Sequence, residues 1–390
     1  MIAEQVRMDM KKGSAIRKMF EEGARLKAIH GAENVFDFSL GNPDLPTPDR
    51  VRERLARIVA EGDGAEHGYM NNAGFWECRV AIAARESRKS GKAIDPEGVI
   101  MTVGAAGALC VIFKAILNPG EEVITISPYF GEYRSYIQDN GGALVDVPTT
   151  RPDFQLDVDA VLEAITPRTK AILINNPNNP TGQIYEKGRL AELNARLKML
   201  DQSIYMVFDE PYVELVYEGE AGSPLGLFEN SIVAYSWSKS LSLAGERIGY
   251  IACSPDCADY ESLRDALVYC NRTLGYVNAP AIWQRVMATE CDVAVDIEPY
   301  RTRRDLICGI LDRNGFTYTK PRGTFYVFPQ APGGDDQKFT EVCALHRVLV
   351  VPGSNFGAPG YFRISYCVNE ETIRRSETAF REIAEYYHLI

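Results

Sequence analysis

Three segments of the chain carry residues that can bind a small molecule or move protons, and each follows a short apolar run. The first is an amide-rich turn at 175–182, the second is Asp209-Glu210-Pro211-Tyr212, and the third is Ser236-Trp237-Ser238-Lys239. The apolar runs at 171–175, 204–208 and 232–235 are typical of buried strands. Ligands of open α/β sheets bind outside the carboxyl ends of the strands, so we expect an amide, a carboxylate with a phenol, and a lysine at one sheet edge.

Each of these residues has an ordinary structural explanation when it is taken alone. An aspartate after a strand often caps a helix or forms a turn, a lysine is usually a solvated surface charge, and Asn-Pro-Thr-Gly favours a turn. The joint occurrence is less easily explained in this way. Lys239 stands beside Trp237 and two serines, on the sheet edge that also receives Asp209. Three successive strand ends of this kind favour a shared chemical function.

This combination resembles the fold-type I pyridoxal-phosphate enzymes, specifically the aspartate-aminotransferase-like class I/II aminotransferases. The resemblance runs from Gly41-Asn42-Pro43 to Arg363, and the blocks at 175–182 and 236–249 carry it most strongly. It implies transamination between an L-amino acid and a 2-oxo acid, with pyridoxal 5′-phosphate as the cofactor and no metal ion.

The resemblance assigns the proton-transfer chemistry to Lys239 and Asp209. A free lysine has a pKa of about 10.4, so presenting its neutral amine at pH 7 costs roughly 4.6 kcal/mol. A Schiff base with an aldehyde avoids that cost until substrate displaces the amine. Lys239 is implied to hold the cofactor in this way and to move a proton between the substrate α-carbon and the cofactor C4′. Asp209 is implied to keep the pyridine nitrogen protonated, because only the cation is a good electron sink.

Other contacts to the cofactor ring also follow from the resemblance. Tyr212 and Asn179 match the positions that hydrogen-bond the phenolic oxygen, where they would stabilise its ionised form, and Tyr212 counts among the expected catalytic residues. Asn179 is also expected beside the substrate. Phe130 matches the aromatic residue that stacks on the pyridine ring.

The phosphate of the cofactor is expected to lie between two parts of the chain. Ser236 and Arg247 match the family's phosphate contacts, and the turn containing Ala105 and Ala106 would direct the N–H groups of a helix N-terminus at the same phosphate. Tyr69 resembles the tyrosine that reaches across a subunit interface to the neighbour's phosphate. The resemblance therefore implies a homodimer.

Substrate recognition is only partly implied. Arg363 resembles the arginine that grips the substrate α-carboxylate in a bidentate fork, and Gly41 is expected beside the substrate. Some relatives carry a lysine for a distal carboxylate where this chain has Ala106. Arg17 and Arg134 are candidate replacements, but nothing in the sequence orients them, so the substrate preference stays open.

The composition limits the class of protein. The chain has 390 residues, of which 46% are apolar and 24% charged, within the range of soluble globular proteins. Its net charge of −11 opposes binding to nucleic acids or anionic membranes. The run from 99 to 113 is too short to span a bilayer. Nine cysteines, four histidines and an N-terminus without an apolar signal segment favour free thiols in the cytoplasm and no metal site.

From about residue 95 to 290, short apolar runs alternate with charged amphipathic segments. This alternation predicts an α/β fold in which helices cover both faces of a mostly parallel sheet. The expected strands are 98–103, 122–127, 171–175, 204–208, 232–235 and 248–253, and 187–200 is an expected helix. We expect residues 45–285 to form a large cofactor-binding domain.

The remaining segments predict a smaller α+β domain from 1–44 and 286–390. Their expected elements are a helix near 16–29, a strand at 35–39, a long helical stretch from Pro280 to about 314, a strand pair at 316–319 and 324–328, strands near 349–351 and 362–366, and a helix from 370.

Three alternatives remain open at this point. A carbon–sulfur β-lyase on the same fold would need the same Lys239 and Asp209. Ser236-Trp237-Ser238-Lys239 also fits the S-x-x-K motif of β-lactamases and penicillin-binding proteins, although the partner S-D-N-like and K-T-G elements are missing from the sequence. A non-catalytic regulator with this body would need an added DNA-binding module, for which the first 45 residues leave little room.

Overall fold

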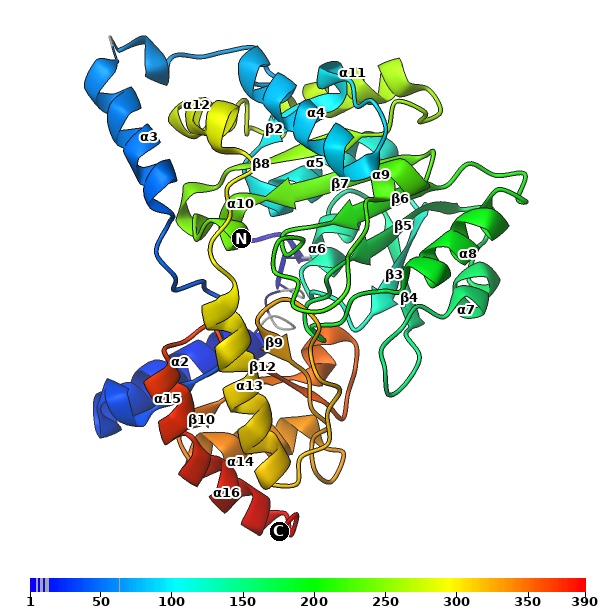
Figure 1. Ribbon diagram of the computed structural model, residues 1–390. Coiled ribbons are helices and arrows are strands. Elements are labelled where there is room, and N and C mark those ends of the chain that lie inside the picture. The colour runs from blue at the N-terminus through cyan, green and yellow to red at the C-terminus, as the bar shows by residue number, and fades with distance from the viewer. Residues whose placement is uncertain (5, 8–9, 11–13, 63) are drawn as a thin grey trace. The chain divides into compact units, whose positions relative to one another are not determined.

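The computed structural model describes residues 1–4, 6–7, 10, 14–62 and 64–390 (Figure 1). The chain divides into two compact units. The large unit comprises Asn42–Ile297 and Arg322–Thr324, and the small unit comprises Met1–Gly41, Glu298–Pro321 and Phe325–Ile390.

The large unit is built on a seven-stranded sheet in the order β2-β8-β7-β6-β5-β3-β4. The strands are β2 (Val99–Thr102), β3 (Glu122–Ser127), β4 (Ala143–Pro148), β5 (Thr169–Asn175), β6 (Tyr205–Asp209), β7 (Ser231–Ser236) and β8 (Gly249–Cys253). Within this sheet β8 runs antiparallel to β2 and β7, and the other pairs are parallel. The prediction of a mostly parallel sheet is confirmed.

The six strands expected in this region are all present, with ends that differ by at most two residues. The additional strand is β4, which pairs with β3 at the sheet edge. Most of its residues are exposed or half-buried, and it includes Asp146, so it lacks the apolar run that marks the buried strands. The expected helix at 187–200 ends three residues early, at Leu197.

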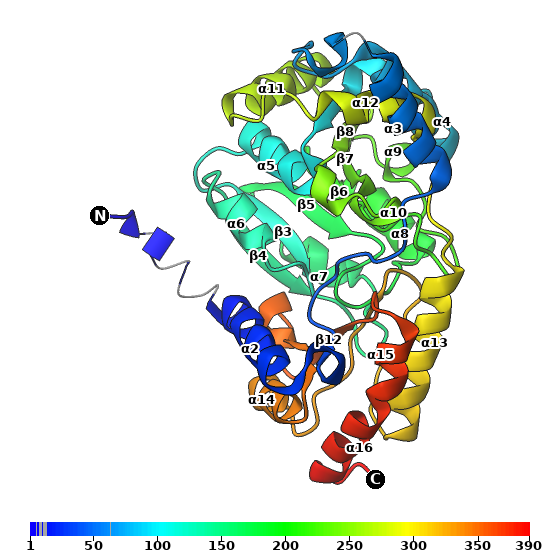
Figure 2. The same cartoon turned by 90° about the vertical axis from the view of Figure 1, so that its left-hand side faces the viewer.

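Helices cover both faces of this sheet. Successive strand residues point to opposite sides, and apolar side chains on both sides are buried under helices. Val207 and Ala234 pack against the helices of one face, and Phe208 and Tyr235 pack against those of the other. The α5 face carries α5 (Gly104–Ile116), α6 (Tyr133–Gln138) and α11 (Tyr260–Thr273). The α4 face carries α4 (Trp76–Ser90), α7 (Val158–Glu163), α8 (Lys187–Leu197), α9 (Pro224–Leu227) and α12 (Ala281–Glu290), with α3 (Asp49–Glu61) against α12. Figure 2 shows α5 and α6 on one side of the sheet and α4 and α9 on the other.

The small unit combines helices with short strands. Its helices include α2 (Ser14–His30), α13 (Glu298–Arg313), α14 (Asp336–Leu345), α15 (Glu370–Arg375) and α16 (Glu377–Tyr386). β1 (Phe36–Asp37) pairs in parallel with β10 (Val348–Leu349), and β11 (Val351–Pro352), β12 (Phe362–Ser365) and β9 (Tyr326–Val327) form an antiparallel sheet in that order. Phe316, Phe339, Phe362 and Phe380 pack mainly edge to face in its core.

Two expectations for the C-terminal part are wrong. The segment 316–319 is not a strand. Phe316 packs in the aromatic core, and the carbonyl of Thr317 accepts a backbone hydrogen bond from the N–H of Gln330 without a strand ladder forming. β9 pairs with β12 instead. The long helical stretch after Pro280 is two helices, α12 and α13, separated by residues 291–297.

No helix in the described part of the chain is both long and apolar enough to cross a membrane. All nine cysteines are free thiols, and eight of them are buried. Among the described residues, no three His, Cys, Asp or Glu side chains are grouped so that they could hold a metal ion.

Candidate functional site

The carboxyl ends of β5, β6 and β7 place three of the predicted residues side by side. Asn175 is in register with Asp209, and Asp209 is in register with Ala234, two residues before the end of β7. Lys239 follows directly in α10 (Trp237–Ser240), a single helical turn. The parallel strands thus bring together residues that lie more than 60 positions apart in the sequence, at the edge where ligands of such sheets bind.

Asp209 is a buried carboxylate with one satisfied and one unsatisfied oxygen. It points to the α5 face, where the Tyr133 hydroxyl on α6 donates a hydrogen bond to its Oδ2. The Asn175 side chain donates to its backbone carbonyl at 2.9 Å. Its Oδ1 is buried, and no described residue donates to it. A buried acceptor without a donor is costly, so this oxygen fits a ligand that brings an N–H group.

The electrostatics of Asp209 are consistent with such a ligand. Burial raises the pKa of its carboxyl to about 7, and the Tyr133 hydrogen bond and the charge of Lys239 act in the opposite direction. Lys239 is therefore close enough to Asp209 to affect it electrostatically, and its side chain is half-buried. A positively charged ring nitrogen beside Oδ1 would lower the pKa of this carboxyl further and keep it ionised.

Glu210, the next residue, does not belong to this site. Strand alternation turns it to the α4 face, where it lies 3.6 Å from the Lys89 amine. Burial raises the pKa of Glu210 to about 8.

A second group of residues forms an anion-binding arrangement on the same edge. Ser236 caps α10 by accepting a hydrogen bond from the N–H of Ser238 at 3.1 Å, and it donates to the carbonyl of Ile248. Arg247 is exposed, and its guanidinium donates to the carbonyls of Ala244 and Val103 at 3.0 and 3.2 Å.

The start of α5 lies beside this guanidinium. Gly104 has a φ of +82°, and a Cβ there would be 3.0 Å from the Arg247 Nη2, so both the backbone conformation and the close approach require glycine. No described side chain caps this helix N-terminus, which contains Ala105 and Ala106. Free N–H groups and a guanidinium together suit a phosphate group.

The remaining predicted residues of the large unit take different positions. Asn179 is buried and donates from its backbone N–H to the Asn175 Oδ1 at 2.7 Å, and Tyr212 is buried in the turn after β6. Phe130 is half-buried and meets the Tyr133 ring edge to face, with centroids 5.7 Å apart. Phe130 therefore lies against the residue that holds Asp209.

Tyr133 is a functional candidate that sequence reasoning missed. It follows Phe130 by three residues, a spacing that places two side chains on neighbouring parts of one helical turn. This spacing is a weak signal, because it does not reveal that α6 packs beside the end of β6.

Gly41 and Arg363 belong to the small unit. Arg363 on β12 is buried, donates to the carbonyl of Ser39 at 2.7 Å, and lies over the rings of Tyr326 and Phe356 at 4.5 and 4.8 Å. A Cβ on Gly41 would be 1.9 Å from the Tyr326 hydroxyl, so the position tolerates only glycine. Sequence reasoning missed Tyr326 and Phe356, which orient the guanidinium.

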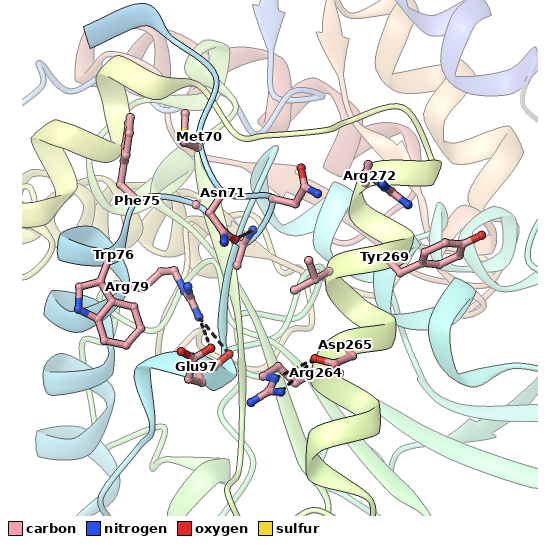
Figure 3. A pocket seen from close by; sticks show the side chains of 14 residues that line it. Met70, Asn71, Phe75, Trp76, Arg79, Glu97, Arg264, Asp265, Tyr269 and Arg272 are labelled. Carbon is pink, nitrogen blue, oxygen red and sulfur yellow. Dashed lines mark hydrogen bonds and ion pairs between the residues drawn. The ribbon is translucent and has the colours of Figure 1, made fainter. Parts of the chain in front are cut away.

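Tyr69 lies on the surface of the large unit. Its side chain is 95% exposed, and the next residue, Met70, begins the lining of a hollow of about 740 Å³ between residues 70–76 and α11 (Figure 3). Arg79 and Arg264 also line this hollow, but they are paired with Glu97 and Asp265.

The geometry does not show that Arg17 or Arg134 binds a distal carboxylate of the substrate. Arg134 donates to the Tyr129 hydroxyl at 2.7 Å. The side chain of Arg17 lies outside the part of the chain whose side chains are described.

Comparison with known proteins gives the family. The chain matches the family described as aminotransferase class I and II over residues 33–379. It is 37% identical over 355 residues to the aspartate/prephenate aminotransferase of Thermus thermophilus, covering 88% of this chain and 89% of that protein. It is 34% identical over 364 residues to the aspartate aminotransferase of Thermotoga maritima, covering 92% and 94%.

Solved structures agree with this match. An aminotransferase from Eubacterium rectale has a TM-score of 0.94 at 38% identity and covers 99% of both chains. The aspartate aminotransferase of Thermus thermophilus with maleate has a TM-score of 0.85 at 33% identity and covers 95% of this chain and 96% of that one. The fold is therefore that of the fold-type I pyridoxal-phosphate enzymes.

The relatives are named as aminotransferases, so the carbon–sulfur lyase alternative is not favoured. Members of the family use pyridoxal phosphate, and the unsatisfied Asp209 Oδ1 and the Arg247 arrangement fit its ring nitrogen and its phosphate. The chain belongs to the class I and II aminotransferases and is a pyridoxal-phosphate-dependent enzyme that exchanges an amino group between an amino acid and a 2-oxo acid.

Proposed function

We propose that this aminotransferase activity is carried by Lys239 and Asp209 at the carboxyl ends of β6 and β7. The observation that carries the proposal is the buried Asp209 Oδ1, which no described residue satisfies, within electrostatic reach of Lys239. When bound, pyridoxal phosphate supplies an aldehyde for amines and a ring that accepts electrons from the substrate α-carbon. Asp209 would hold a proton on the ring nitrogen, and the Lys239 Nζ would accept a proton from the substrate α-carbon.

The other residues would bind and orient. Ser236, Arg247 and the α5 N-terminus with Ala105 and Ala106 would bind the phosphate. Phe130, Asn179 and Tyr212 would hold the ring and its phenolic oxygen. We also propose that the large unit is the cofactor-binding domain and that the small unit supplies Gly41 and Arg363 to the substrate.

A spectroscopic screen tests the proposed reaction and addresses the substrate. Each of the twenty amino acids is added to the holoenzyme without a 2-oxo acid, and conversion of the bound aldehyde to the amine form is followed by absorbance. At least one L-amino acid should convert the cofactor stoichiometrically, and a 2-oxo acid should reverse the change. Release of free thiol and pyruvate from a sulfur amino acid, without amine formation, would contradict the proposal.

The relatives do not point to a single substrate. They include proteins named aspartate/prephenate aminotransferase and aromatic-amino-acid aminotransferase. Because Ala106 offers no cation, we propose that any distal carboxylate is recognised by a residue other than that at position 106.

Tyr133→Phe tests the support of Asp209. The Tyr133 hydrogen bond lowers the pKa of the Asp209 carboxyl, so its removal should raise that pKa. We expect the acidic limb of the kcat/KM profile to move to higher pH by roughly one unit, which is the scale of a neutral hydrogen bond to a charged group. Tyr136→Phe, on the same helix, is the control. An unshifted profile for Tyr133→Phe would contradict this role.

Arg363→Lys tests the proposed carboxylate contact. A lysine keeps the charge but cannot form a bidentate fork or stack on Tyr326 and Phe356. We expect kcat/KM to fall by roughly 10- to 100-fold, which corresponds to about 1.4–2.7 kcal/mol. A 2-oxo acid titration of the amine form measures the weaker binding directly. Equal affinity for the carboxylate substrate in both proteins would contradict the assignment.

We propose that the active form is a homodimer in which Tyr69 contacts the cofactor phosphate of the neighbouring subunit. Tyr69 is 95% exposed, and Trp76 and Tyr269 beside the hollow in Figure 3 are 51% and 58% exposed. A second copy of the chain would cover these aromatic side chains. The unpaired thiols are consistent with a reducing cytoplasm, where we propose that the enzyme works.

Subunit mixing tests this arrangement. Tyr69→Ala and Lys239→Ala each lack one part of every site, whereas a mixed dimer has one complete site. We expect the mixture to recover up to about a quarter of wild-type activity at saturating cofactor, because half of the random dimers are mixed and each has one site of two. Mixing Tyr69→Ala with wild-type protein controls for exchange. No gain on mixing, with exchange demonstrated, would contradict the cross-subunit role.

A further inference from the structure

Buried Arg85, Tyr235 and Ser240 and half-buried Glu214 form a group of ionic and hydroxyl side chains on the α4 face of the large unit, next to the lysine turn. The Tyr235 hydroxyl on β7 donates to the Glu214 Oε2 at 3.0 Å and shares a hydrogen bond with the Ser240 Oγ at 3.0 Å. Arg85 on α4 pairs with Glu214 and lies 4.4 Å from the centroid of the Tyr235 ring. We call Arg85, Glu214, Tyr235 and Ser240 the Tyr235 network.

This network is on the opposite side of the sheet from Asp209 and the anion-binding arrangement. Tyr235 packs in the apolar core of the α4 face, and strand alternation turns the next residue, Ser236, to the α5 face. The Tyr235 hydroxyl therefore lies on the opposite side of the sheet from the Asp209 carboxyl and can act on that site only through the segments to which it bonds.

Helix α10 depends on outside anchors, because a single helical turn is not stable alone. The Ser236 side chain caps its start, the Trp237 indole N–H donates to the carbonyl of Cys291 at 3.2 Å, and Ser240 bonds to Tyr235 at its end. Of the four side chains in the turn, Lys239 is the one that is not buried. The anchors on either side of Lys239 thus hold the backbone from which its side chain extends.

The network also holds the turn that carries Tyr212. Glu214 follows Tyr212 by two residues, and the N–H of Leu215 closes that turn on the carbonyl of Tyr212 at 2.8 Å. The Tyr235 hydroxyl therefore contacts both segments of the proposed site: Glu214 in the segment after β6 and Ser240 in the segment after β7. The Arg85–Glu214 ion pair connects the first of these segments to α4.

Stability alone does not account for this arrangement. Arg85 is buried and the Glu214 side chain is 20% exposed, so desolvation offsets part of their attraction, and well-packed apolar residues can stabilise such a position equally well. Arg85 and Tyr235 are buried, and the Tyr235 and Tyr250 rings stack 4.9 Å apart around the pair. The network adds hydrogen bonds, which fix the orientation of the groups that they join, whereas apolar packing does not.

We propose that Tyr235 and Ser240 are positioning residues that fix helix α10, and with it the Lys239 amine, through the Arg85–Glu214 pair on the far face of the sheet. The inference rests on the proposed role of Lys239. It adds that catalysis depends on a hydroxyl that touches neither substrate nor cofactor.

Tyr235→Phe removes the hydroxyl and keeps the ring that packs on Arg85 and Tyr250. We expect kcat to fall by roughly tenfold with KM changed by less than about twofold, the scale of losing one hydrogen bond that orients a reacting group. The pH at which the absorbance of the bound cofactor changes should shift, and apoprotein should reconstitute with pyridoxal phosphate more slowly. Tyr260→Phe is the matched control, because that hydroxyl also bonds to a carboxylate, Asp95, at 3.2 Å, but on α11.

Ser240→Ala removes the other partner of the Tyr235–Ser240 hydrogen bond. It tests the same positioning role if the Tyr235→Phe protein does not fold. If both residues act through this bond, the double variant should lose little more activity than either single variant, whereas independent effects would multiply. Multiplicative losses, or a Tyr235→Phe enzyme with wild-type kcat, absorbance pH profile and reconstitution rate, would overturn the proposal. A lower melting temperature without those changes would also overturn it, since that is a purely structural effect.

These outcomes are separable from failure of the proposed function. Borohydride treatment of the wild-type holoenzyme tests the attachment of cofactor at Lys239 without reference to Tyr235. The positioning role is tested only by the difference between wild type, the Tyr235 and Ser240 variants and Tyr260→Phe.

Discussion

Lys239→Ala is expected to abolish transamination, with a loss of roughly 10⁴-fold or more, because in the proposed mechanism one amine both holds the cofactor and moves the substrate proton. The structure places this amine in a turn held by buried anchors and within electrostatic reach of Asp209. Single-turnover absorbance with saturating amino acid measures the loss directly. Borohydride should fix the cofactor to a Lys239 peptide in the wild type and to no peptide in the variant.

Lys198→Ala is the matched control for this substitution. Lys198 is an exposed lysine that pairs with Glu229 at 2.6 Å, so its removal should leave both activity and labelling unchanged. Lys239→Arg keeps a positive charge but provides no amine that condenses with an aldehyde, and it should be as inactive as the alanine variant. Turnover within tenfold of wild type in Lys239→Ala or Lys239→Arg would contradict the assignment of Lys239.

Asp209→Ala is expected to lose about 100- to 1,000-fold in kcat while it still binds the cofactor, the scale of removing one preorganised electrostatic partner. The proposed phosphate contacts lie on other segments, at Ser236, Arg247 and the α5 N-terminus, so binding should persist. Cofactor content after gel filtration and kcat measured on the same sample separate the two effects. Loss of binding together with activity would instead make Asp209 a structural residue.

Asp209→Asn should reveal the cost of keeping this carboxylate buried. The pKa of Asp209 in the folded apoprotein, about 7, lies above the usual value near 3.9, so the folded state favours the protonated form. The stability of the folded apoprotein that depends on a protonated Asp209 carboxyl is present at low pH and is lost as the pH rises from about 4 to 7. The asparagine apoprotein should therefore be more stable than wild type at pH 8, by a few kcal/mol at most, and the advantage should vanish near pH 4.

Thermal unfolding of both apoproteins across that pH range measures this difference. Asp146→Asn is the comparison, because Asp146 is an exposed residue on the edge strand β4. Equal pH dependence of wild type and Asp209→Asn would show that the Asp209 carboxyl is not desolvated as the structure indicates.

Much of the large unit follows from local sequence pattern. The run at 171–174 is apolar throughout because both faces of a strand inside the sheet are buried, and this pattern can be recognised without knowing the neighbouring strands. The edge strand β4 carries no such signal, since it is mostly exposed or half-buried. The segment 316–319 misleads for the opposite reason: its apolar character serves an aromatic core and not a ladder.

For the site, the order of residues along the chain predicts which chemical groups follow each strand: the amide turn, Asp209 with Tyr212, and Ser236 to Lys239. Connectivity alone places such groups at the carboxyl edge of a parallel sheet. Only the tertiary structure decided their partners. Tyr133 reaches Asp209 across 76 residues, and Arg85 reaches Tyr235 across 150, because the packing of helices on the two faces sets those contacts. Local periodicity encodes which face a residue occupies, whereas the neighbour that it meets there depends on how distant elements pack.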